Sequence, residues 1–247
     1  MGGTTINAEG ISYRELNEQV RAAASSGACE VTLVNVSGHR YIGAGLGAGP
    51  LITVHGVPGN DLGAFMNGAQ VVVRGNAQDG VGNTMNAGRI CVHGDAGDII
   101  GYSMRGGKIF VRGSVGYRAG IHMKAYRDRQ PTVVIGGSAA DYLGEYMAGG
   151  VLVVLGLNAA GSSPVDEYVG TGMHGGTIYV RGELAPYQVG AALETSRLEA
   201  RDWEGLSALL EEFARDVEWD APRRLKREEF IKLAPTTARP YGTLYAY

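Results

Sequence analysis

The chain has 247 residues, of which 40 are glycine, and it carries 22 Lys and Arg against 25 Asp and Glu. Glycine far exceeds its usual share of about 7%, yet it has neither the three-residue period of collagen nor the polar context of a disordered tract. The net charge of −3 gives no electrostatic reason to expect nucleic acid or an anionic membrane as a partner. The composition therefore predicts a folded protein with many tight corners.

The N-terminus and the cysteines indicate the compartment. The first ten residues, MGGTTINAEG, lack the basic and apolar regions of a signal peptide. No apolar run approaches the roughly 20 residues that cross a bilayer. Cys29 and Cys91 show no metal-ligand spacing, and Cys91 falls on a predicted strand, so two reduced structural thiols are expected. We therefore expect a cytoplasmic protein with no membrane role.

The N-terminal part is predicted to contain one helix and one strand. Residues 12–25 place Ser12 at the N-cap and Glu15 three residues later, with apolar residues on one face. Gly27 is expected to end this helix. Residues 30–36, EVTLVNV, alternate as a strand does. They lead into an atypical first coil, in which Gly47 is assigned to the position that methionine holds later.

One pattern then repeats along the chain. Its opening glycines Gly56, Gly75 and Gly94 stand 19 residues apart. In each copy a glycine precedes a methionine by three residues, and these methionines are every one in the chain except Met1. Such self-similarity is typical of a solenoid. The corner glycines are Gly63, Gly82, Gly101, Gly120, Gly144 and Gly170, and the methionines are Met66, Met85, Met104, Met123, Met147 and Met173.

Apolar residues recur five and seven residues after each methionine, as in a short strand with one buried face. A 19-residue coil with this much glycine leaves no room for a helix. The pattern predicts an all-β solenoid, a parallel β-helix of about seven coils between residues 37 and 190. Methionine is expected to fill the interior beside each corner. Copper(I) binding by the thioethers is the alternative, which the aliphatic neighbours disfavour.

Two insertions interrupt the repeat. Residues 124–131, KAYRDRQP, lengthen the interval from Gly113 to Gly137 to 24 residues. Residues 158–168, NAAGSSPVDEY, lengthen the interval from Gly156 to Gly182 to 26. Both are predicted to be surface loops. Insertions in a solenoid often gather on the face that binds a ligand or partner, but a neutral loop is an equal alternative.

The C-terminal part is predicted to begin with an amphipathic helix over residues 196–218, with Gly205 as a candidate kink. A basic run follows at residues 223–230, and then a tail with Tyr241, Tyr245 and Tyr247, which is expected to lie against an apolar surface. The helix is a candidate cover for an apolar column that points outward from the coils, six residues after each methionine. That column reads Val72, Cys91, Phe110, Val134, Val153 and Tyr179.

Charged residues also form columns. One coil position is cationic or nearly so and stands directly before the glycine that follows each strand. It holds His55, Arg74, His93, Arg112 and Arg181. Solvated rows are the simpler interpretation, since like charges about 4.8 Å apart cost little in water. The three arginines, with Phe110 and Tyr179, are nevertheless candidate interface residues. A second column, six or seven residues before the methionine, is acidic: Asp79, Asp98, Asp141 and Glu167.

Catalytic signals are weak throughout. His122 and His174 flank methionines without a carboxylate or cysteine partner at a fixed offset, so ordinary corner residues are expected. The chain has no GxSxG, no P-loop and no cysteine cluster for an iron–sulfur centre. The glycine-rich residues 43–49 lack the strand, turn and helix context of a dinucleotide site. No catalytic, cofactor-binding or metal-binding residue is predicted.

The repeat resembles a known family. The pattern GxxGxxM, and above all DYLGEYMAGGVLVVLG at residues 141–156 followed by GTGMHGGTIYVRG at residues 170–182, resembles the C-terminal GXGXG domain of the glutamate synthase large subunit. The resemblance covers roughly residues 38–190. The general repeat is also similar to the C subunit of formylmethanofuran dehydrogenase and to a subunit of N-methylglutamate synthase. In this family the domain is a right-handed β-helix, so the resemblance implies that hand.

The resemblance implies a non-catalytic scaffold subunit of a glutamate-synthase-like oxidoreductase complex. A glutaminase-type amidotransferase subunit and a synthase subunit with FMN and an iron–sulfur cluster are the implied partners, and a homo-oligomer is a further candidate. No cofactor is expected in this chain. The alternative is the equivalent scaffold of a formylmethanofuran dehydrogenase, a formyltransferase/hydrolase complex or N-methylglutamate synthase. A hexapeptide acyltransferase is disfavoured, because its coils are multiples of six residues.

The chain is accordingly divided into three parts. Residues 1–36 hold the helix and the leading strand, residues 37–190 form the GXGXG β-helix, and residues 191–247 hold the amphipathic helix and tail. The two helical parts are expected to be additions to the solenoid.

Overall fold

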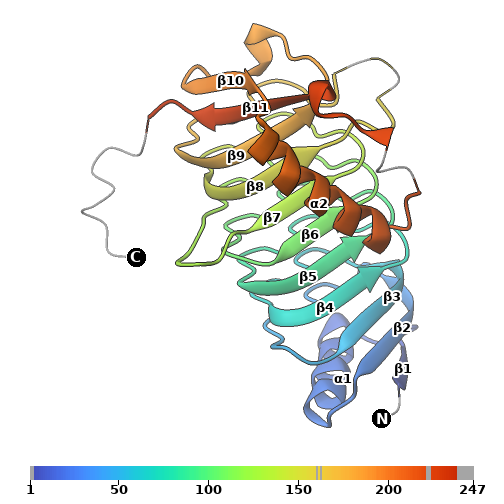
Figure 1. Ribbon diagram of the computed structural model, residues 1–247. Helices are drawn as coiled ribbons and strands as arrows, with labels where there is room; N and C mark the ends of the chain where they lie inside the picture. Colours follow the sequence, from blue (N-terminus) through green and yellow to red (C-terminus); the bar gives the residue numbers. More distant parts are fainter. Residues whose placement is uncertain (1–2, 160, 162, 221–223, 238–247) are drawn as a thin grey trace.

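The computed structural model describes residues 3–159, 161, 163–220 and 224–237 and shows a parallel β-helix (Figure 1). Seven strands stack in parallel and in sequence order, which gives six complete turns between the first and the last. They are β3 (Leu51–Val57), β4 (Asn67–Val73), β5 (Ala87–Val92), β6 (Lys108–Val111), β7 (Thr132–Ile135), β8 (Ala148–Val154) and β9 (Gly175–Arg181). The predicted solenoid is therefore confirmed.

The register of the strands follows the repeat. Val71 pairs with Ile90, Ile90 with Ile109, and the same column continues to Ile178. Both predicted inward columns are buried in one continuous core. The six methionines lie in the same core, five with no exposed surface and Met173 with 3%. Each turn of the solenoid thus buries like residues on like residues.

The corner glycines are needed for two reasons. Their φ angles lie between 67° and 76°, in the left-handed region that glycine adopts without a steric penalty. A Cβ on Gly63 would also lie 2.5 Å from Cδ1 of Ile90, and one on Gly82 would overlap Ile109. The corner therefore leaves space for the inward side chain of the next coil. This explains why glycine, the methionine and the aliphatic residue recur together.

The N-terminal end adds two strands and a helix to the solenoid. Strand β2 (Glu30–Ser37) pairs with β3, and β1 (Gly3–Asn7), which the sequence did not indicate, pairs with β2. Helix α1 (Tyr13–Ser25) has the predicted N-cap, because Oγ of Ser12 accepts the N–H of Glu15 at 3.2 Å. Leu16 and Val20 on α1 are buried in the core of the solenoid. The helix thus closes the N-terminal end of the core.

The assignment of the first coil needs one correction. Leu46, not Gly47, occupies the methionine position: the N–H of Asn67 donates to the carbonyl of Leu46, as the N–H of Asn86 donates to that of Met66 in the next coil. The first coil carries one additional residue before its strand. Five residues before Ile52, the spacing of the later coils, is Gly47, whereas the structure has Leu46 at the methionine position.

The C-terminal end closes the sheet with an antiparallel pair. Strand β11 (Phe230–Pro235) runs antiparallel to β9, and β10 (Leu193–Arg197) pairs with β11. The basic run and the tail were not predicted to contain a strand. Short 3-10 helices at Pro186–Gln188 and Arg227–Glu229 lead into this pair. Residues 238–247, with the three tyrosines expected to pack, and residues 221–223 lie outside the described part.

Helix α2 (Ala200–Asp216) crosses the outer face of the strands obliquely, from β9 towards β5 and β4 (Figure 1). It starts four residues later than predicted, because Ser196 and Arg197 belong to β10. It runs through Gly205 as one helix. Helix α2 therefore lies on the outer face of the sheet, and the core of the solenoid lies on the inner face. Two surfaces of the solenoid carry distinctive side chains: the outer face of the sheet and the line of corner turns.

Candidate functional site

The outward apolar column lies beneath α2, as predicted. Phe110 is completely buried and its ring meets that of Phe213 edge to face, with centroids 5.7 Å apart. Leu206 and Leu210 of α2 join the same cluster, as does Val217, the C-cap of the helix. Tyr179, only 9% exposed, donates its hydroxyl to Oδ1 of Asp202 at 3.3 Å. Phe110 and Tyr179, which were candidate interface residues, thus face α2 of their own chain.

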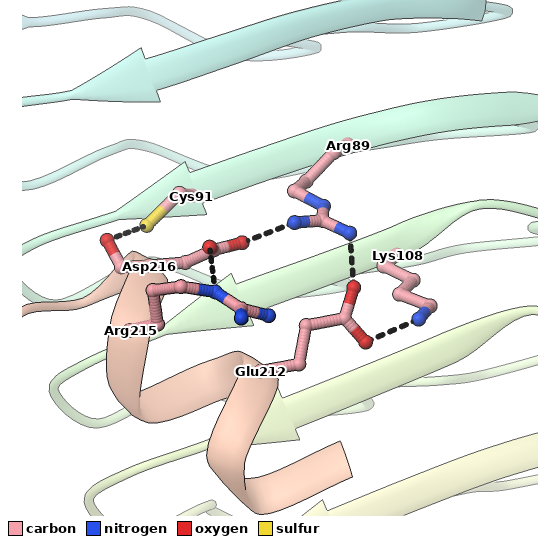
Figure 2. A network of polar contacts seen from close by, with 6 residues as sticks. All are labelled: Arg89, Cys91, Lys108, Glu212, Arg215 and Asp216. Atoms are coloured by element: carbon pink, nitrogen blue, oxygen red, sulfur yellow. Dashed lines mark hydrogen bonds and ion pairs between the residues drawn. The ribbon is translucent and has the colours of Figure 1, made fainter. Parts of the chain in front are cut away.

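An ion-pair network ties the C-terminal half of α2 to the sheet (Figure 2). Arg89 on β5 pairs with Glu212 and, at 2.6 Å, with Asp216. Lys108 on β6 pairs with Glu212 as well. The Cys91 thiol donates to the carbonyl of Asp216 at 3.2 Å. Burial, together with the negative charge of Asp216, raises the pKa of the Cys91 thiol to about 12. Cys91 is therefore a structural thiol rather than a nucleophile.

The sequence contained a signal for this network that was not used. Arg89 and Lys108 occupy the outward position four residues after the methionine, beside the apolar column. Glu212 and Asp216 stand four residues apart on the apolar side of the predicted helix, so they share its face. Cations on adjacent coils and acids one helical turn apart together indicate the contact. The helix is thus held by charge as well as by apolar burial.

Two of the three candidate interface arginines also hold the C-terminal segment. Arg74 pairs with Glu218 at 2.6 Å and lies 3.3 Å from Nε2 of His93. Burial, followed by the charge of Arg74, lowers the pKa of His93 below its usual value. Arg181 pairs with Glu229 at 2.7 Å. Arg112 is exposed and has no ion pair among the described residues. The cationic column thus serves mainly intramolecular contacts.

The acidic column binds the backbone of the neighbouring coil. Oδ1 of Asp79 accepts the N–H of Asp98 at 3.0 Å, and Oδ1 of Asp98 accepts that of Tyr117 at 2.8 Å. Asp141 does the same for the N–H of Glu167 at 2.9 Å. These carboxylates satisfy amides that the irregular corners leave unpaired. Their role is to connect one coil to the next, and nothing in this geometry requires a bound ligand.

The corner turns carry an exposed surface of another kind, which we call the aromatic surface and define by Tyr102, His122, Tyr142, Tyr146 and Tyr168. His122 stacks on Tyr146 with centroids 5.3 Å apart and planes 12° apart, and it meets Tyr102 edge-on at 6.1 Å. Tyr142 stacks on Tyr168 at 4.9 Å.

An ion pair links the two stacks of the aromatic surface. Arg118 donates to Oε2 of Glu145 at 2.8 Å, and its guanidinium lies 4.7 Å from the centroid of the Tyr142 ring. Glu145 is directly followed by Tyr146 in the chain, while the Arg118 guanidinium lies over the first ring of the other stack. The surface is therefore one connected set of side chains across successive coils.

The backbone beneath this surface is unfavourable for bulky residues. His122, Tyr142, Tyr146 and Tyr168 all have φ between 52° and 64°. Such left-handed conformations cost on the order of 1 kcal/mol or more for residues of this kind. The coil imposes the conformation, since Gly80 and Gly172 adopt it at equivalent positions. Other residues adopt the same conformation at these positions, such as Thr84 and Ile99, so the strain belongs to the coil and not to the aromatic residues alone.

Gly172 shows how the ring of Tyr146 is accommodated. A Cβ at Gly172 would overlap that ring, which lies flat over the next corner. Tyr146 remains 47% exposed and Tyr168 46%. Exposed tyrosine held in a fixed orientation is typical of protein interfaces, because it offers a large contact area at a small entropic cost. The aromatic surface is therefore the candidate functional site, and of its residues the sequence had singled out only His122.

In the part of the chain that the structure describes, no group of three or more His, Cys, Asp and Glu side chains could hold a metal ion. Nδ1 of His174 donates a hydrogen bond to the carbonyl of Gly172 at 3.2 Å. No helix among the same residues is long and apolar enough to span a membrane.

Comparison with known proteins agrees with the geometry. The family described as GXGXG motif matches residues 14–235, which include all of α1 but its first residue, strands β2 to β11 and helix α2. The chain belongs to the GXGXG motif family. It is also 44% identical over 253 residues to "Uncharacterized protein MJ1350" from Methanocaldococcus jannaschii, and the match covers 99% of this chain and 97% of the relative. In this chain the match therefore extends over the solenoid and its terminal additions.

Proposed function

We propose that this chain is a non-catalytic scaffold subunit of a glutamate-synthase-like complex. The observation that carries the proposal is the family match over residues 14–235, since the GXGXG domain is the C-terminal domain of the glutamate synthase large subunit. A glutaminase-type amidotransferase subunit and a synthase subunit with FMN and an iron–sulfur cluster are the proposed partners. The cofactors would reside on the synthase subunit.

The architecture supports a scaffold role. The coils pack on one another in one continuous core and form an extended surface, so partners could bind at different coils of the same chain. Helix α2 already occupies much of the outer face of the strands, so the corner turns offer a separate surface for a partner. The aromatic surface lies on these turns, and we assign it to contact with a partner subunit.

The test is co-expression with the glutaminase-type and FMN-dependent subunits encoded in the same genome. We expect one complex containing all three chains, detected by native mass spectrometry, with ammonia-dependent and glutamine-dependent glutamate formation. Tyr102→Ser combined with Tyr146→Ser should weaken association at least tenfold, because interface tyrosines often contribute more than 1.4 kcal/mol each. Tyr187→Ser is the matched control, since Tyr187 is 70% exposed and lies outside the aromatic surface.

Two results would argue against the proposal in different ways. Failure of the wild-type chain to associate with both subunits, or its association with formyl-transfer subunits instead, would contradict the assigned complex. Equal association of the double variant and the control would leave the complex intact but show that the aromatic surface is not the contact.

A further inference from the structure

A small apolar pocket lies between the first half of α2 and the outer face of β8 and β9. Its volume is about 280 Å³, and Val151, Tyr179, Leu206 and Leu209 supply its apolar walls. Helix α2 crosses the strands obliquely (Figure 1), and the pocket lies beside its N-terminal half. On β5 and β6 the outward position four residues after the methionine is filled by Arg89 and Lys108; on β8 the same position is Val151.

Gly205 stands at the edge of this pocket and is not explained by the rest of the chain. It lies exposed in the interior of α2, where glycine costs roughly 0.5–1 kcal/mol relative to alanine. A Cβ built on Gly205 would meet no atom within 4 Å, so neither packing nor backbone conformation requires glycine there. Its effect is to leave the entrance of the pocket open.

The charges around the pocket are unequal. Asp202 accepts a hydrogen bond from Nζ of Lys232 at 2.7 Å as well as the one from Tyr179, so its charge is already compensated. Arg201, which also lines the pocket, is exposed and has no ion pair among the described residues. The pocket therefore presents apolar walls and one uncompensated positive charge.

The volume of the pocket limits the size of the group that it can bind. Pockets for drug-sized molecules usually measure about 300–1,000 Å³, so this one is at or below the lower limit and suits a single aliphatic side chain. We propose that it binds an aliphatic side chain of a partner protein, next to a carboxylate that pairs with Arg201. The inference goes beyond the proposed function, because it does not depend on which complex the chain joins.

The test uses N-acetyl-leucine as the probe, since it combines the aliphatic group with a neighbouring carboxylate. Backbone amide signals of the full-length chain are followed by NMR as the probe is added at millimolar concentration. We expect saturable shifts at Val151, Gly205 and Leu206. N-acetyl-leucinamide, the neutral control, should bind about two- to fivefold more weakly, the ratio expected for one exposed ion pair.

Four variants, two of them controls, make the experiment decisive without a loss of folding. Gly205→Leu should abolish the shifts by closing the entrance, while its melting temperature stays equal or rises, because leucine favours a helix. Gly205→Ala removes the glycine without filling the pocket and should bind as the wild type does. Arg201→Gln should remove the preference for the acid over the amide, whereas Arg21→Gln on α1 should retain it.

Three results would contradict the proposal in whole or in part. Absence of saturable shifts in the wild type, or unchanged shifts in Gly205→Leu, would overturn the pocket as a binding site. An unchanged preference for the acid in Arg201→Gln would overturn the carboxylate. These readouts use the isolated chain, so they are separate from the test of the glutamate-synthase-like complex.

Discussion

Glycine and methionine occupy their positions in each coil for complementary reasons. The glycine adopts a left-handed φ and leaves space for the aliphatic residue of the next coil. The methionine, unbranched and flexible, fills the volume that remains; at Gly101, for example, a Cβ would lie 3.7 Å from Sδ of Met104. An aliphatic β-branched residue could not follow the corner in the same way, because its χ1 is restricted.

The methionine column can be tested at its centre. Met104→Ala should lower the free energy of unfolding by about 2–5 kcal/mol, because it leaves a cavity between coils that are held apart by their backbone hydrogen bonds. Chemical denaturation of the variant and the wild type measures the difference. Arg105→Ala is the neighbouring control; Arg105 is exposed, and its loss should change stability by less than about 0.5 kcal/mol. A similar small effect for Met104→Ala would mean that the column does not support the core.

The residue scale is also where the sequence predicted most. The repeat located the methionines and corner glycines correctly because a fixed period averages out local ambiguity. The first coil was misassigned, with Gly47 in place of Leu46, because one inserted residue shifts the count there and no second copy corrects it. The aromatic surface was not predicted, since its residues occupy several coil positions, five, two or one before the methionine, and each position is aromatic or histidine only in some coils.

At the scale of elements, the sequence predicted α2 but not β11. The apolar face of α2 and the apolar column beneath it both appear in the sequence, so their contact could be inferred. Strand β11 follows a basic run and includes Lys232 and Pro235, so its composition does not identify a strand. Its pairing is imposed by β9, whose outer edge would otherwise be open. A local sequence pattern does not show such pairing between strands that are far apart in the chain.

Carboxylates on α2 and just before β11 make the docking of this segment dependent on pH. Burial raises the pKa of Asp202, but the hydrogen bond from Lys232 and further donors outweigh it, and the net pKa is lowered. For Glu229, burial is likewise outweighed by Arg181. A carboxyl with a lowered pKa in the folded state stabilises that state when ionised, so the contribution is present above the unfolded values of 3.8 and 4.5.

We therefore expect the melting temperature to fall as the pH is lowered from about 5 to about 3, through the titration of these groups. Circular dichroism across this range measures the slope. Asp202→Asn should make the slope shallower, while Asp220→Asn, a change at an exposed position after α2, should not. An identical slope in wild type and Asp202→Asn would show that Asp202 does not link docking to pH.

For the whole molecule, the two ends of the solenoid are closed in different ways. At the N-terminus α1 covers the core while β1 extends the sheet in parallel. At the C-terminus β11 and β10 cover the edge of β9, and α2, on the segment between them, returns along the outer face. The C-terminal segment thus protects an edge and a face at once. Stability and solubility of the solenoid should depend on the same 47 residues, 191–237.

Deletion of the chain after Gly190 tests this dependence. It removes β10, α2 and β11, so the apolar column with Phe110 and the hydrogen-bonding edge of β9 both become exposed. We expect aggregation in size-exclusion chromatography and strong binding of a hydrophobic dye.

Phe213→Asp separates the two effects, because it places a charge against Phe110 and loosens α2 while β11 stays paired with β9. This variant should bind the dye yet remain largely monomeric, since its sheet edge is still covered. If the deleted chain stays monomeric and free of dye, the C-terminal segment does not protect the solenoid. If Phe213→Asp aggregates as strongly as the deletion, the exposed apolar face, and not the open edge of β9, causes the association.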